Sequence, residues 1–124
     1  MGSSPEPSHP LEVLYRVRDG LREATTSQLR ADLTKQDLPS YGWTLQSILD
    51  NLMELTRVLA GQIDDLDRER LYRGTLRDHP YEVIDHAVDQ LRALQRTLAV
   101  ATRDVATYRS DALHVHRNVR DQER

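Results

Sequence analysis

Apolar residues recur every three or four positions along most of this chain, which is the period of an amphipathic α-helix. The pattern predicts three helices, at about residues 10–35, 41–72 and 80–119. Pro10 and Pro80 stand where the first and third helices begin, and proline is favoured at the first helical position. The sequence therefore predicts an all-α fold.

The third helix has the most regular pattern, because its apolar positions follow steps of three and four without a slip over five heptads. That repeat is typical of a coiled-coil seam. These positions are Ile84, Ala87, Leu91, Leu94, Leu98, Ala101, Val105, Tyr108, Ala112, Val115 and Val119. The corresponding positions of the second helix are Leu45, Ile48, Leu52, Leu55, Leu59, Ile63 and Leu66.

Two short segments break the helical pattern, residues 36–42 around Pro39 and residues 73–79 around Gly74. Short connections make consecutive helices antiparallel neighbours. We therefore predict three long antiparallel helices that form an elongated helical bundle or coiled-coil hairpin. The predicted organisation is a disordered N-terminal tail (1–9), a single helical-bundle domain (10–119) and a frayed C-terminus (120–124).

The predicted third helix is longer than its neighbour, at roughly 60 Å against roughly 45 Å for the second helix. Its apolar repeat continues into the part that the second helix does not cover, and an uncovered apolar stripe predicts a partner. The predicted partner-binding residues are Val105, Tyr108, Ala112, Val115 and Val119. The expected function is a non-enzymatic protein–protein interaction module (a regulator, adaptor or assembly subunit). Its expected partner is another protein or a second copy in a homo-oligomer.

The composition of the chain narrows the classes of function that remain. The chain has 124 residues, a net charge of −3 and no cysteine, which excludes disulfides and thiolate metal sites. Positive and negative charges are mixed along its length, so nucleic-acid binding is not favoured. No apolar run is long enough to span a membrane, and the N-terminal residues do not resemble a signal peptide. We therefore expect a cytoplasmic protein.

Metal and cofactor sites are not expected. His114 and His116 are two residues apart on a helix, so they point to different sides and cannot share an ion. Asp111 and His114 have the spacing of helical carboxylate–histidine ligands, but a di-iron bundle needs this unit twice. The sequence has no second copy of it.

An alternative function comes from the segment between Arg109 and His114, in which four residues separate an arginine from a histidine. This spacing resembles the motif of HEPN-type helical domains, and Arg109 with His116 also fits it. The resemblance implies a dimeric ribonuclease or a toxin–antitoxin component. In such a protein Arg109 would stabilise the charged phosphate, and the histidine would act as general acid or base.

Overall fold

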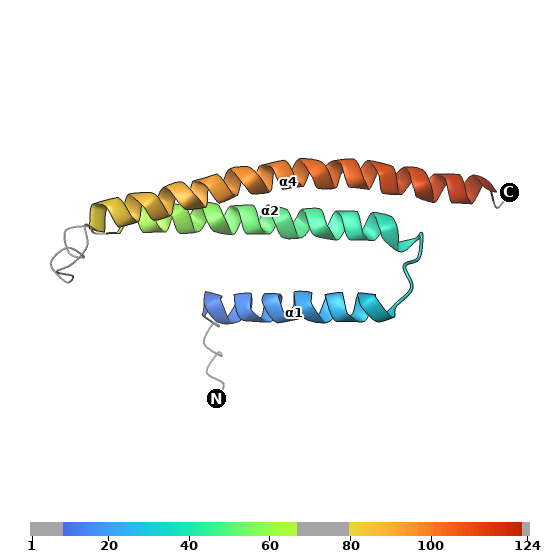
Figure 1. Cartoon of the computed structure of the whole chain (residues 1–124), viewed down its shortest axis with the longest axis horizontal. Coiled ribbons are helices and arrows are strands. Elements are labelled where there is room, and N and C mark those ends of the chain that lie inside the picture. The colour runs from blue at the N-terminus through green and yellow to red at the C-terminus, as the bar shows by residue number, and fades with distance from the viewer. Residues whose placement is uncertain (1–8, 67–79, 123–124) are drawn as a thin grey trace, which may run out of the picture. The chain divides into compact units, whose positions relative to one another are not determined.

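The computed structural model describes residues 9–66 and 80–122, and it is helical over almost all of them. The helices are α1 (Pro10–Arg30), α2 (Asp37–Asp64) and α4 (Pro80–Gln122), as Figure 1 shows. The described residues contain no strand, so the predicted all-α fold is confirmed. The chain divides into two compact units, residues 1–34 with α1 and residues 35–124 with α2 and α4.

The predicted chain ends lie partly outside the described residues. Residues 1–8 and 123–124 are not among the residues that the structure describes, so the disordered tail (1–9) and the frayed C-terminus (120–124) stay predictions. α4 continues to Gln122, slightly beyond the predicted end near Val119. The single domain expected over residues 10–119 also stays a prediction.

The first unit is one amphipathic helix that starts where the proline predicts. His9 caps α1: its Nδ1 accepts a hydrogen bond from the Leu11 N–H at 3.1 Å, and its carbonyl accepts one from Glu12 at 2.9 Å. These bonds satisfy amide groups that the first turn leaves without helical partners. No residue of α1 is buried, and its large apolar residues, including Val17 and Leu21, are exposed.

The break between α1 and α2 covers residues 31–36 rather than the predicted 36–42. α1 ends at Arg30 because Ala31 has extended backbone angles, φ −95° and ψ 149°. α2 begins at Asp37, so Pro39 falls inside its first turn. A proline there removes no helical hydrogen bond, because the first N–H groups of a helix have no partner within it.

α2 also ends earlier than predicted, at Asp64 instead of about Tyr72. The Asp65 N–H donates to the Gly61 carbonyl, and the Leu66 N–H donates to the Ile63 carbonyl, both at 3.1 Å. Aspartate is a poor helix former, and its charge is unfavourable at a helix C-terminus. The neighbouring Asp64 and Asp65 therefore account for the stop. Residues 67–72 lie outside the described residues.

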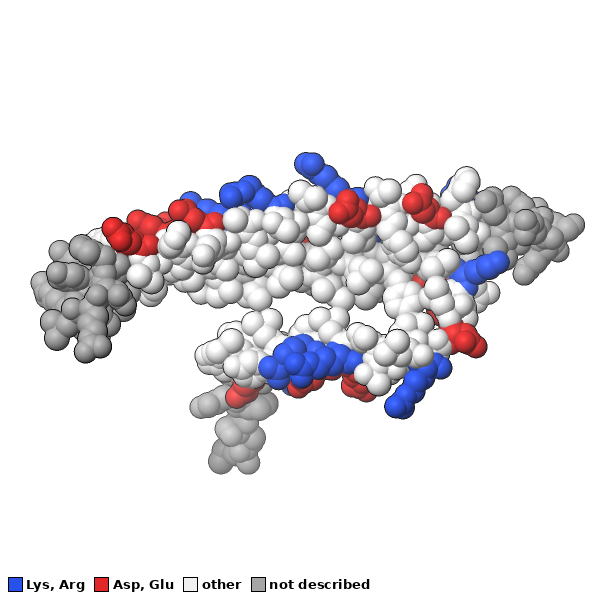
Figure 2. Space-filling model, viewed as in Figure 1, with Lys and Arg blue, Asp and Glu red and all other residues white. Residues whose placement is uncertain are grey.

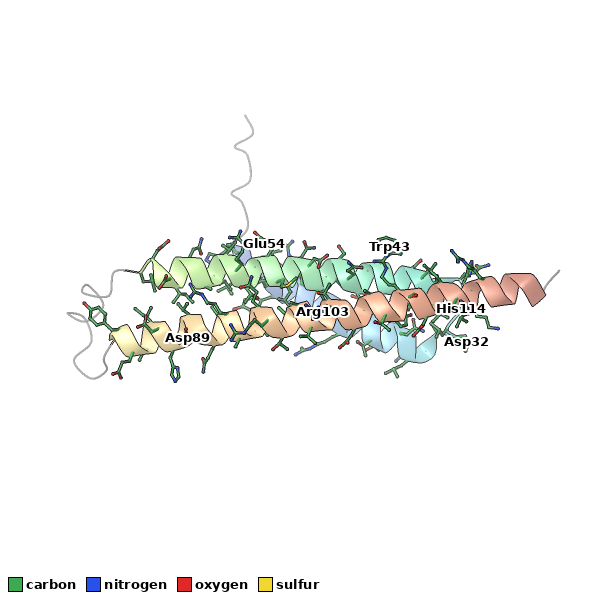
Figure 3. All side chains as sticks on the ribbon, turned by 90° about the horizontal axis from the view of Figure 1, so that it is seen from above. Asp32, Trp43, Glu54, Asp89, Arg103 and His114 are labelled. Atoms are coloured by element: carbon green, nitrogen blue, oxygen red, sulfur yellow. The ribbon has the colours of Figure 1, made fainter. Side chains whose placement is uncertain are left out.

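α2 and α4 pack side by side and run antiparallel, as Figures 1 and 3 show from two directions. We call the residues that face each other between these helices the seam. On α2 the seam comprises Gly42, Gln46, Leu49, Met53, Thr56, Ala60 and Ile63. On α4 it comprises Ile84, Val88, Leu91, Gln95, Leu98, Thr102, Val105, Arg109, Ala112 and His116.

The seam differs from the predicted one in one of its two rows on α4 and in both rows on α2. On α4 the row from Ile84 to Ala112 is as predicted, but the second row lies one residue later and holds Gln95 where Leu94 was expected. On α2 the seam lies one residue after the predicted positions, so Gln46, Met53 and Ala60 take the places of Leu45, Leu52 and Leu59, and only Ile63 is as predicted. Small residues at a helix contact allow a shorter distance between the helix axes. On α2 the buried contact positions are therefore the small residues Gly42, Thr56 and Ala60, and Leu45, Leu52 and Leu59 lie beside the contact.

Polar side chains in the seam have hydrogen-bond partners within their own helices. The Thr56 hydroxyl donates to the Leu52 carbonyl at 2.7 Å, and the Thr102 hydroxyl donates to the Leu98 carbonyl at 2.9 Å. A buried hydroxyl without a partner would be unfavourable. These bonds let threonine occupy positions that the apolar pattern assigned to leucine or alanine.

Candidate functional site

α2 and α4 approach each other closely at Gly42, which is buried. A Cβ atom there would clash with Cγ of Arg109 and would lie 3.2 Å from two ring carbons of Tyr108. A glycine is therefore required for α4 to pack at this distance. The contact fixes which residues of the two helices lie opposite each other.

Arg109 is held by two side chains of α2. Its guanidinium carbon lies 3.4 Å from the centroid of the Trp43 ring, a cation–π contact. One terminal nitrogen donates a hydrogen bond to Oε1 of Gln46. The Nε atom is buried and has no hydrogen-bond partner. Trp43 itself stays 60% exposed, so the stacked pair lies at the surface near one end of the hairpin (Figure 3).

Tyr108 fastens the beginning of α2 to α4, because its hydroxyl donates to the Leu38 carbonyl at 3.0 Å. α2 consequently covers more of α4 than the sequence predicted. Ala112, expected on the uncovered part of the long helix, is only 3% exposed.

The five predicted partner-binding residues therefore have different surroundings. Val105 and Tyr108 are half-buried, Ala112 is buried, and Val115 is 43% exposed. The Val119 side chain lies outside the described residues. A role for these five residues in binding a partner stays a prediction.

The three predicted catalytic residues do not gather on one surface. Arg109 and His116 are half-buried members of the seam, whereas His114 is exposed. Five helical residues correspond to a rotation of roughly 500°, so Arg109 and His114 point about 140° apart. Their catalytic roles stay predictions, and the guanidinium that would have to reach a phosphate is stacked on Trp43.

A row of mostly apolar residues on each helix lies beside the seam. Each of these residues follows a seam residue by three positions, and they recur every seven residues. We call it the open face, and it consists of Leu45, Leu52, Leu59 and Leu66 on α2 with Ala87, Leu94, Ala101, Tyr108 and Val115 on α4. Its four α2 leucines, Leu94 and Val115 are between 39% and 47% exposed. The helices are antiparallel, so equal displacements along each sequence place both rows on the same side of the hairpin. None of the nine residues carries a charge.

Within residues 9–66 and 80–122, no group of three or more histidine, aspartate or glutamate side chains is placed to hold a metal ion. None of the helices in the described part of the chain is long and apolar enough to cross a membrane. Comparison with protein-family models, curated proteins and solved structures finds no match for this chain.

Proposed function

We propose that this chain is a non-enzymatic helical protein–protein interaction module that binds its partner through the open face. The observation that carries the proposal is the exposure of Leu45, Leu52, Leu59 and Leu94 in one uncharged strip. The strip follows the same seven-residue spacing as the seam, so a helix packed on it would continue the seam's geometry.

Energetics support this proposal. Covering the exposed part of each leucine contributes on the order of 1 kcal/mol, because apolar area removed from water is stabilising. Contiguous apolar patches of several hundred Å² mark binding surfaces in proteins. Figure 2 shows charged side chains along the outer edge of α4, whereas the surface over α2 in the same view is mostly uncharged.

A photo-crosslinking residue in place of Leu52 tests the proposal in cells that make the protein. We expect a protein adduct of higher mass, because Leu52 lies in the open face. The same residue in place of Asp50, which is exposed outside the open face, is the matched control and should give no such adduct. Adding Leu45→Gln and Leu59→Gln should abolish the Leu52 adduct. Absence of an adduct from both positions would contradict the proposal.

The ribonuclease alternative requires Arg109 to leave Trp43 and Gln46. We expect no RNA cleavage by the purified chain. Cleavage that is lost in both Arg109→Ala and His114→Ala, with helix content unchanged by circular dichroism, would favour the alternative over the interaction module.

A further inference from the structure

We infer that the partner on the open face is a second copy of this chain, which rests on the proposed function and names its partner. Two α2–α4 hairpins would pack face to face as a four-helix bundle. In this arrangement α2 of each copy lies antiparallel against α4 of the other.

The open face is complementary to itself. Its α2 row contains leucine at every position, whereas its α4 row alternates small alanines, Ala87 and Ala101, with larger side chains. A two-fold axis parallel to the helices places each α2 row on the α4 row of the second copy. At the levels of Ala87 and Ala101 a leucine of the other copy then lies above a small side chain, which is how helix layers interdigitate. A two-fold interface uses the same patch on both subunits, so both rows of each copy would be buried in it.

The packing inside one hairpin sets the levels at which the two copies would meet. The contact of Gly42 with Arg109 brings Leu52 near the level of Ala101, and Leu59 near that of Leu94. A two-fold axis along the helices preserves these levels between copies. Leu52 of one copy is therefore expected to pack beside Ala101 of the other.

Charge and area are compatible with self-association. Two identical surfaces repel each other where they carry charge, and none of the nine open-face residues does. Covering the open face would bury on the order of 500 Å² per copy, less than the roughly 800 Å² per partner of a standard stable interface and in the range of weaker ones.

Molar mass in solution tests this inference first, by light scattering behind a sizing column. We expect twice the monomer mass of 14.3 kDa for the full chain. The double variant Leu52→Gln/Leu59→Gln should have the monomer mass with unchanged helix content. Val100→Gln is the matched control, because Val100 is exposed but lies outside the open face, and this variant should remain a dimer.

A disulfide test then checks the arrangement, since the chain has no cysteine of its own. A mixture of chains carrying Leu52→Cys with chains carrying Ala101→Cys should form a disulfide between the two variants, identified by mass spectrometry of the linked peptides. Chains carrying Ala106→Cys, on the other side of α4, should not link to Leu52→Cys chains. A disulfide that joins only two Leu52→Cys chains would overturn the packing of α2 against α4.

A wild-type monomer would overturn the inference, and a second readout then separates the remaining cases. An adduct from position 52 with a different protein would leave the interaction module standing with another partner. A monomer whose double variant loses its helix content would mean that the open-face leucines belong to the core of the chain itself. That outcome would overturn both proposals.

Discussion

The seam and the open face lie side by side on the same two helices, and on α2 the buried seam positions hold smaller side chains than the open face. Buried seam positions include Gly42, Thr56 and Ala60, whereas Leu52 and Leu94 on the open face remain about two-fifths exposed. Helices approach closely where side chains are small, and the seam follows these residues. On α4, in contrast, the buried seam positions include the large residues Ile84, Val88 and Leu98, so exposure on these helices follows position relative to the seam and not side-chain size.

The largest expected effect on stability comes from truncating a leucine of α4 in the seam, compared with truncating one on the open face. Leu98 is 7% exposed in the seam and Leu94 is 44% exposed on the open face. Leu98→Ala should lower the free energy of unfolding by about 3 kcal/mol, because it leaves a cavity, and Leu94→Ala by about 1 kcal/mol or less. Urea denaturation of dilute protein measures both, since association adds to apparent stability at high concentration. Equal losses would show that the two leucines have the same burial.

A smaller effect is expected at two glycines of α2. Gly42→Ala should lower the free energy of unfolding by about 1–3 kcal/mol, because the new methyl group clashes with Arg109 and pushes α4 away. Gly61→Ala is the matched control: nothing lies within 4 Å of its added Cβ, so higher helix propensity should raise stability by about 0.5–1 kcal/mol. Thermal denaturation followed by circular dichroism distinguishes these opposite signs. A stabilising Gly42→Ala would contradict the close approach.

The smallest effect is expected away from both surfaces, at the exposed pair Glu54 and Arg57. Arg57 Nε donates to Glu54 Oε2 at 3.1 Å. This hydrogen bond, together with the charge of Arg57, lowers the pKa of Glu54 below its ordinary value of 4.5. The stabilisation is present above that ordinary value and disappears as pH falls through the lowered pKa.

Exposed ion pairs contribute little to stability. Glu54→Gln should therefore change the thermal midpoint less than either glycine substitution at neutral pH. The difference from wild type should vanish in acid. A difference that grows as pH falls would contradict the assigned sign.

The sequence was sufficient to predict the three helices and the start of α1, because period and proline position are local signals. It identified one row of the seam on α4 but not the second, since Leu94 and Gln95 are adjacent and both fit a helical repeat around Leu91 and Leu98. Only the packing partner chooses between them. The signal for the α2 side of the seam was the seven-residue spacing of Gly42, Leu49, Thr56 and Ile63. Small residues such as glycine and threonine that repeat at this spacing with apolar ones indicate a close helix contact.

The prediction of the partner-binding residues depended on where α2 was expected to begin. An α2 beginning at about Tyr41 would have left Ala112 uncovered, whereas the observed start at Asp37 buries it. Pro39 misled the boundary prediction because proline disfavours helix at the preceding residue, yet the first turn tolerates it. The stacking of Arg109 on Trp43 joins residues far apart in sequence, and neither residue alone indicates the other.

The contact of Gly42 with Arg109 also determines how the hairpin would respond to force. The beginning of α2 and the C-terminal part of α4 lie at the same end of the hairpin (Figure 3). Tension pulling those two segments apart would act on the Trp43–Arg109 stack and the Tyr108–Leu38 hydrogen bond first, and would then peel the helices apart one turn at a time. Peeling loads few contacts at once, in contrast to shear along the helix axes, which loads the whole seam together. The Trp43–Arg109 stack and the Tyr108–Leu38 hydrogen bond therefore set the force at which the hairpin begins to open.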